Sequence, residues 1–500
     1  MTVSRWVIRL TACAWLVWLA SSASAAGEAG SPSDAAKAPE AKDAPAAAAP
    51  KADAKAEDAP AAAKPVDPIE DFIQKTKQPV PWFNWGADFR FRDEYYNNVF
   101  TLNKNDPARE RNYLRYRPRW WGTITPVKGI DLNGRLVWEG RYYTKPDHHL
   151  APANQSDWDQ GEVMWDNLNL RLTDIGGSGL SATVGRQDLK YGEGWLVTDG
   201  TPRDGSRTTY FDAYKLSYEA KPIQTTFDAV FIHNKADPED DWLRNLKDLD
   251  LLTIEQDQNG FLFYVSNKSL PKTRIDAFYI YKDETARMRG GDDGYLHTFG
   301  ASVGGDLAEH WQYRAEGAHQ FGQRNGRTAQ ACGLNGWVAY LFREAGNNRL
   351  RTTYEFLSGD DPDSRTDEQF DPLWGRWPLW SELWAYHQVN EMGRYAYTTN
   401  LHRLAFGWAV VPVKRTEFLL DYHLLWADEN TLGATAAGRR RGFSRTDSFR
   451  GQLVTARLKF DICKHLSGHL LGEFFFPGDA YLKNFNDPAT FLRSELVFTW

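Results

Sequence analysis

Guanidinium groups recur at alternate positions along many short segments of this 500-residue chain. Arginine can bind a carboxylate or a phosphate through two parallel hydrogen bonds, and rings of arginine and lysine attract anions and exclude cations. The chemistry that this pattern predicts is the reversible binding of an anionic solute. The cations that would share one face of their segments are Arg90, Arg92, Arg115, Arg117, Arg119, Arg135, Arg141, Arg171, Arg314, Arg351, Arg403, Arg457, Arg493, Lys215 and Lys459.

Carboxylates accompany these cations on the same face. They would keep part of each guanidinium paired, which would stop an anionic chain from binding too tightly to leave. A second interpretation is that arginine–glutamate pairs only stiffen the wall of a barrel and do not touch solute. Arg115, Arg117 and Arg119 are the best candidates for a basic stripe along a pore. The acidic members of the face are Asp88, Glu94, Glu139, Glu316, Glu355, Glu417, Asp421, Glu473 and Glu495.

The segments that carry these charges alternate polar and apolar residues with a period of two, which is typical of β-strands. Leu114, Tyr116 and Trp120, for example, alternate with the three arginines of the candidate stripe. In a transmembrane barrel the apolar face meets lipid and the polar face meets a wet lumen. We count about 18 such segments of ~8–12 residues, a number that bacterial barrels allow. A single segment of this kind also fits a soluble β-sandwich, but a solvated face usually carries lysine, glutamate, threonine and serine.

The connections between these segments alternate in length. Short turns such as 126–129 and 174–179 are followed by long polar stretches such as 145–161, 235–260 and 359–394. Short turns at one end and long loops at the other are typical of transmembrane barrels. The sequence therefore predicts an all-β fold, a transmembrane antiparallel β-barrel over residues 80–500.

The N-terminal 25 residues have the composition of an export signal. Arg5 and Arg9 precede an apolar run, and Ala23-Ser24-Ala25 supplies small residues before a cleavage site. A lipoprotein signal ending at Cys13 is the alternative. Residues 26–79 follow as a predicted low-complexity periplasmic linker, a disordered tether rich in alanine and proline. The net charge of -7 is too small to suggest a nucleic-acid partner.

The C-terminus points to the outer membrane of a diderm bacterium. Leu496, Phe498 and Trp500 share one face of the last segment, and this ending resembles the signal read by the barrel assembly machinery. The chain holds 21 Trp and 22 Tyr, which suit a membrane–water interface because their rings are apolar and their N–H or O–H stays wet. Membrane lipid and lipopolysaccharide are therefore expected partners. A soluble, tryptophan-rich lectin is the alternative on composition.

Several motifs resemble the alginate-export family of outer-membrane barrels. They are Gly185-Arg186-Gln187, Tyr191-Gly192-Glu193-Gly194 with Tyr210-Phe211-Asp212, and the segments 313–322, 354–361 and 474–479. The resemblance implies an 18-stranded barrel that passes an acidic polysaccharide through an arginine-rich constriction, with Arg186 and Glu316 in matched motifs. Arg186 shares parity with Val184 and would face lipid unless Gly185 forms a bulge. Export and uptake both stay open.

Motifs for other chemistry are missing from the sequence. It has no G-x-S-x-G, H-E-x-x-H, Walker loop or G-x-G-x-x-G, so we expect neither an enzyme nor a cofactor. The acidic loop with Asp360, Asp361 and Asp363 is a weak candidate for a structural Ca²⁺ site. Asp147-His148-His149 is expected to be an exposed loop, and Cys332 and Cys463 form either one disulfide or two free thiols. A small-anion or general diffusion porin and an outer-membrane enzyme such as a lipase remain the rival functions.

Overall fold

The computed structural model describes residues 68–107, 109–145, 158–198, 210–246, 254–288, 290–344 and 346–500. The chain divides into two compact units, one ending at Pro79 and one spanning Val80–Trp500. The predicted signal peptide and residues 26–67 of the predicted linker lie outside the described residues. The loop that contains Asp147-His148-His149 does so too.

The last part of the predicted linker contains a helix. Helix α2 spans Pro68–Lys77. Proline at the first helical position lacks the N–H that a helix start leaves unbonded. Glu70 and Asp71 lie in the first turn and Lys75 and Lys77 in the last, which matches the helix dipole. Lys75 also pairs with Asp71 one turn earlier, at 2.5 Å. The charges at its ends and the i,i+4 pair thus favour a helix in this short segment.

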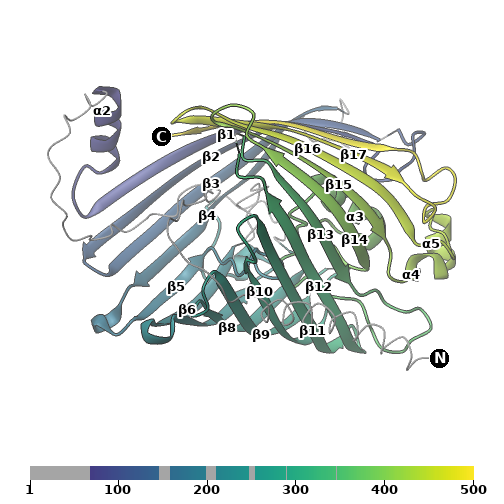
Figure 1. Ribbon diagram of the computed structural model, residues 1–500, viewed down its shortest axis with the longest axis horizontal. Coiled ribbons are helices and arrows are strands. Elements are labelled where there is room, and N and C mark those ends of the chain that lie inside the picture. The colour runs from purple at the N-terminus through teal and green to yellow at the C-terminus, as the bar shows by residue number, and fades with distance from the viewer. Residues whose placement is uncertain are drawn as a thin grey trace. The chain divides into compact units, whose positions relative to one another are not determined.

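The second unit is a closed barrel of eighteen antiparallel strands, as predicted (Figure 1). Each strand pairs with its neighbours in sequence, and β1 pairs with β18 to complete the ring. The strands are β1 (Phe83–Asn97), β2 (Glu110–Val127), β3 (Ile130–Lys145), β4 (Trp158–Leu172), β5 (Leu180–Gln187), β6 (Phe211–Ala220), β7 (Thr225–Asn234), β8 (Gln256–Asn267), β9 (Thr273–Ala286), β10 (Gly294–Asp306), β11 (Trp311–Arg324), β12 (Arg327–Leu341), β13 (Arg349–Leu357), β14 (Leu401–Val410), β15 (Thr416–Trp426), β16 (Phe449–Cys463), β17 (Leu466–Pro477) and β18 (Ala489–Thr499).

The alternation in sequence becomes two faces of the wall. In β1 the charged residues Arg90, Arg92 and Glu94 are buried inside, whereas Phe89 is 43% exposed on the outside. The same holds around the ring, where large apolar side chains are exposed on the outer face of nearly every strand. A barrel core of this kind is a shell, so its interior is free to be polar.

The two ends of the barrel differ as expected. One end has short turns, such as 128–129 and 464–465, and both termini of the barrel unit; the other has long connections, including 358–400. Short turns are periplasmic in such barrels, so we call the two halves of the lumen the turn side and the loop side. Short helices lie in the connections: α3 (Glu382–Met392), α4 (Thr431–Ala434), α5 (Ala436–Arg440) and the 3₁₀ turns η2 (Ile175–Gly177), η3 (Lys221–Ile223) and η4 (Pro238–Asp240). None of the helices in the described ranges is long and apolar enough to cross a membrane.

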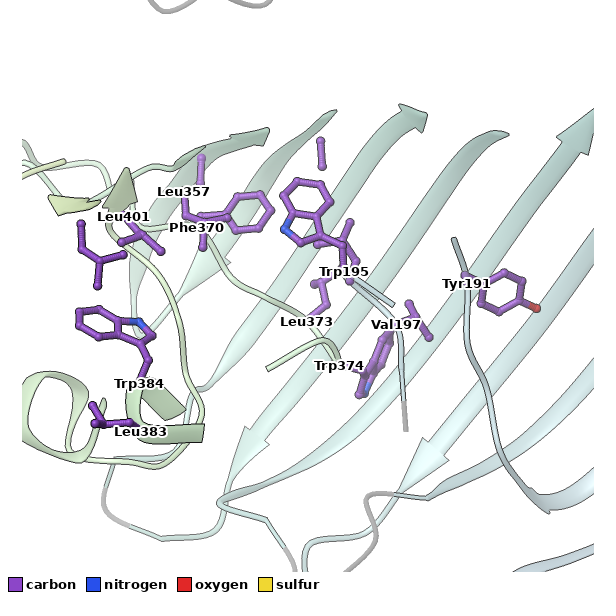
Figure 2. Close-up of a cluster of buried hydrophobic side chains, with 14 of the residues drawn as sticks. Tyr191, Trp195, Val197, Leu357, Phe370, Leu373, Trp374, Leu383, Trp384 and Leu401 are labelled. Atoms are coloured by element: carbon purple, nitrogen blue, oxygen red, sulfur yellow. The ribbon is translucent and has the colours of Figure 1, made fainter. Parts of the chain in front are cut away.

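Two loop-side connections fold back into the barrel, which the sequence did not predict. The described segments 188–198 and 358–400, called here the inner plug, meet where Val197 bridges to Trp374. The rings of Trp195 and Phe370 stack at 5.6 Å beside this bridge (Figure 2). Trp384 of α3 is fully buried. The interior of the loop side is therefore an aromatic core.

Candidate functional site

The inward faces of β18, β1, β2 and β3 carry a buried group of charges, called here the arginine cluster. Strand register creates it, because Arg92 lies opposite Arg115 and Arg90 lies opposite Arg117. Such close guanidinium groups repel one another and tolerate burial only with carboxylates among them. The cluster comprises Arg90, Arg92, Arg115, Arg117, Arg141 and Arg493 with Glu94, Glu139, Glu495 and Glu382.

The carboxylates of the cluster each bridge several arginines. Glu94 accepts from Arg115 at 2.8 Å and from Arg493 at 2.7 Å. Glu139 lies 3.1 Å from Arg90 and 3.2 Å from Arg115. Glu495 pairs with Arg92 and also contacts His469 at 3.1 Å. Five of the six guanidinium groups thus pair with these four carboxylates, Arg117 lies among them opposite Arg90, and the cations of the cluster outnumber its acids.

Arg186, which matches a family motif, is buried, but no bulge places it there. The register between β4 and β5 is unbroken through Gly185, whose φ is +115°. Glycine tolerates this conformation, and it allows both Arg186 and Gln187 to be buried beyond the exposed Val184.

The guanidinium of Arg186 is fully engaged in the barrel wall. It donates to Asp212 at 3.0 and 2.8 Å, to Asp241 at 2.8 Å and to the carbonyl oxygen of Trp165 at 2.9 Å. Burial and the neighbouring Asp212 raise the pKa of the Asp241 carboxyl to about 7. Arg186 therefore acts as a clamp between wall and loop.

The other matched motifs converge on the inner plug. Arg314 and Glu316 pair at 2.8 Å on β11. Gly192 has φ +59°, and a Cβ added there would lie 2.7 Å from Nη2 of Arg314. The next residue, Glu193, accepts a hydrogen bond from Trp337 at 3.0 Å. The glycine motif thus lets the plug backbone lie directly against the Arg314–Glu316 pair.

Glu355 joins the plug to strands β13 and β14. Its carboxylate accepts from Trp195 of the plug at 3.1 Å and from Arg403 of β14 at 2.9 Å. The Arg403 guanidinium also lies over the ring of Trp380, 4.6 Å from its centroid. The predicted inward residues Arg314, Glu316, Glu355 and Arg403 are therefore brought together by the loops.

The remaining predicted cations lie toward the turn side, and several of them are more accessible than the buried arginines of the cluster. Arg351 is 41% exposed and 3.6 Å from Asp421, whereas Arg115 is 0% exposed. Arg119 pairs with Asp88, and Lys459 lies 3.1 Å from Glu417. In the same group, Arg135 pairs with Asp166 and Asp188, and Lys215 pairs with Asp228. Arg171 is exposed, and Arg457 is partly buried.

Two carboxylates of the acidic loop accept hydrogen bonds from other groups of the protein. Asp360 makes a two-fold pair with Arg327, at 2.6 and 2.9 Å, and Asp361 accepts from the backbone of Asp363. Among the described residues, the acidic group with metal-like spacing is instead Glu284, Asp292 and Asp371. Lys282 lies 2.7 Å from Glu284 and Arg394 lies 2.7 Å from Asp292, so cationic side chains already neutralise it. In both groups some carboxylates are thus engaged by donors of the protein.

Two further expectations concern the cysteines and the C-terminus. Cys332 and Cys463 are both free thiols.

Leu496 and Phe498 are exposed on the outer face of β18, and the backbone N–H of Trp500 donates to Ala87 of β1. The last residue thus takes part in closing the ring.

The comparisons with known proteins agree with this architecture. The family model described as "Alginate export" matches residues 81–491. No curated protein matches the sequence.

Solved structures share the fold at low sequence identity. Acinetobacter baumannii OccAB2 is 9% identical, with a TM-score of 0.53 over 83% of this chain and 98% of its own. OccAB1 from the same organism is 11% identical, with a TM-score of 0.51 over 84% and 97%. Pseudomonas aeruginosa OccK3 (OpdO) is 10% identical, with a TM-score of 0.50 over 83% and 95%. The chain belongs to the alginate-export family and is an integral outer-membrane β-barrel that forms a channel for polar solutes.

Proposed function

We propose that this channel passes an anionic solute, an acidic polysaccharide in particular, through a lumen with a positive potential. The observation that carries the proposal is the arginine cluster, in which six guanidinium groups lie among four carboxylates. Charges surrounded by a low-dielectric wall are weakly screened, and a lumen lined by one sign of charge concentrates ions of the other sign.

The buried and the accessible cations have different roles in this proposal. Apart from Arg141, which is 33% exposed, the cluster is buried and sets the potential without touching solute. The accessible cations of the turn side, such as Arg351, Arg457 and Lys459, make transient contacts with carboxylates of the chain. Their own acidic neighbours, such as Asp421 and Glu417, compete for them and keep the solute mobile.

Block of single-channel current by short oligouronates tests this proposal. We expect oligouronates to block the current at lower concentration than neutral oligosaccharides of the same length. The double variant Arg351→Gln/Arg457→Gln should weaken that block, because it removes accessible charge. Lys414→Gln, in an exposed turn, is the matched control and should behave as the wild type. Equal block by charged and neutral sugars would overturn the proposal.

The inner plug favours a second candidate, a porin for small anions. Trp195, Phe370 and Trp384 occupy the loop side of the lumen, and a filled loop side suits a small solute better than a polymer. Under this alternative, chloride and small carboxylates carry current through the channel while oligouronates leave that current unchanged.

A further inference from the structure

The barrel wall has a notch on the loop side of β5. Strand β4 begins at Trp158, but it pairs with β5 only from Leu168 to Leu172. Among the described residues, segment 241–246 lies along the remaining edge of β4, where the N–H of Leu246 donates to the carbonyl oxygen of Val163 at 2.8 Å. We call this segment the strap. A loop thus completes the wall where strand pairing stops.

The Arg186 clamp holds the strap in place. Its guanidinium joins Trp165 of β4, Asp212 of β6 and Asp241 of the strap. Trp242, the next residue of the strap, is 58% exposed. The strap therefore presents a large apolar side chain at the outer surface while its neighbour anchors it inside.

Below the strap lies a cavity of about 600 Å³, called here the wall pocket. It is lined from both sides of the wall. The outer lining includes Trp120, Leu132, Leu170, Val184 and Tyr214, all exposed toward lipid, and the inner lining includes Asn133 and Asn169. A volume of this size is typical of sites for small ligands.

We propose that the wall pocket binds the acyl chain of a membrane phospholipid. Its mouth opens on the outer face of an integral outer-membrane barrel, so hydrocarbon is the medium that meets it. Water entering through that mouth would lose its hydrogen bonds, and an empty pocket would deprive its aromatic lining of dispersion contacts. An acyl chain has no hydrogen bonds to lose, and it fills the pocket and restores the dispersion contacts of the aromatic lining.

The position of the pocket along the wall selects phospholipid over lipopolysaccharide. Ile124, Leu132 and Leu170 line it close to the short turns 128–129 and 173–179. Short turns are periplasmic, and the periplasmic leaflet of an outer membrane is made of phospholipid. At its rear, Asn133 and Asn169 hydrogen-bond to each other at 3.1 Å and close the pocket toward the lumen.

Photocrosslinking in vesicles tests this site. The full-length protein is reconstituted in phosphatidylethanolamine and phosphatidylglycerol that carry a diazirine near the end of one acyl chain, and labelled residues are mapped by mass spectrometry. We expect label on the inward residues Asn133 and Asn169, which surrounding lipid cannot reach. Labelling confined to outward residues would overturn the proposal.

Two variants make the result specific. Leu170→Trp fills the pocket and should abolish most of the label on Asn133 and Asn169. Leu350→Trp is the matched control, because Leu350 is 48% exposed on β13, against 37% for Leu170, and lies away from the pocket. Heat-modifiable gel mobility confirms that each variant is folded; if Leu170→Trp is not, Val184→Phe serves the same purpose. Unchanged inward label in a folded, filled variant would overturn the site, and lipopolysaccharide recovered with the purified protein in place of phospholipid would overturn the assigned source.

Discussion

The loop side and the turn side of the lumen use the same residue types with opposite results. On the loop side, Arg115 is completely buried between Glu94 and Glu139, beneath the inner plug. On the turn side, Arg351 is 41% exposed and has one acidic neighbour at 3.6 Å. Both arginines occupy inward positions of alternating strands. The loops, and not the strands, decide whether an inward charge is structural or accessible.

This difference has an energetic consequence. Breaking a buried pair leaves an uncompensated charge in a low-dielectric medium, whereas an exposed pair contributes little to stability. Substitutions of loop-side charges should therefore mainly change the stability of the barrel, and substitutions of turn-side charges should mainly change ion conduction.

Glu94→Gln should produce the largest loss of stability. The carboxylate bridges Arg115 and Arg493, and its removal leaves two guanidinium groups without their shared counter-charge. We expect a loss of about 3–5 kcal/mol, measured by urea unfolding in detergent micelles. Glu417→Gln on the turn side is the control, because Glu417 is partly exposed. Equal losses of stability in the two variants would contradict the proposed difference between the loop side and the turn side of the lumen.

Trp384→Ala should loosen the inner plug. The side chain is fully buried against Phe475, with ring centroids 5.7 Å apart, and lies near Arg450. We expect a loss of about 3 kcal/mol and a rise in single-channel conductance. Trp408→Ala, on the outer face of β14, should leave the conductance unchanged. A conductance unaffected by Trp384→Ala would mean that the plug does not limit flow.

Gly192→Ala should have an intermediate effect. A left-handed residue other than glycine costs about 1–2 kcal/mol, and the new methyl group would also push Arg314 away from Glu316. Gly326→Ala matches the backbone strain, since Gly326 has φ +78° and nothing within 4 Å of an added Cβ. The loss of unfolding free energy in Gly326→Ala measures the backbone strain alone, and the additional loss in Gly192→Ala measures the effect of the contact with Arg314. Identical losses would show that the contact with Arg314 is dispensable.

The Arg186 clamp should respond to pH, and the response should be local to the strap. The pKa of Asp241 is raised from 3.8 to about 7, by burial and by Asp212, so the folded strap holds a proton that the released carboxyl would lose. Its stability should fall as pH rises from about 4 through 7 and be lowest above 7. Hydrogen exchange at the N–H of Leu246, corrected for the intrinsic rate, should accelerate over this range. Asp241→Asn should remove the change, and the same acceleration in that variant would contradict the assignment.

The sequence predicts the wall better than the interior. Period-two alternation locates the strands because lipid and lumen impose opposite demands on adjacent residues. The partners of inward charges often lie in loops, as Glu382 does for Arg493 and Asp241 for Arg186. No local periodicity specifies such long-range contacts. The aromatic residues Phe370, Trp374 and Trp384 in a long polar stretch were the available signal for the inner plug.

Arg186 shows a second limit. Parity with Val184 predicts that it faces lipid, but Arg186 is buried because Asp212 and the strap residue Asp241 bind its guanidinium. Local alternation does not indicate that a distant loop covers an outward position.

The reversal potential of the reconstituted channel in a KCl gradient tests the central claim most directly. A lumen in which the arginine cluster keeps a positive excess predicts that wild-type channels prefer chloride over potassium. This preference should weaken at high salt and fall further in Arg351→Gln/Arg457→Gln. A preference for potassium, or no preference at low salt, would contradict the account.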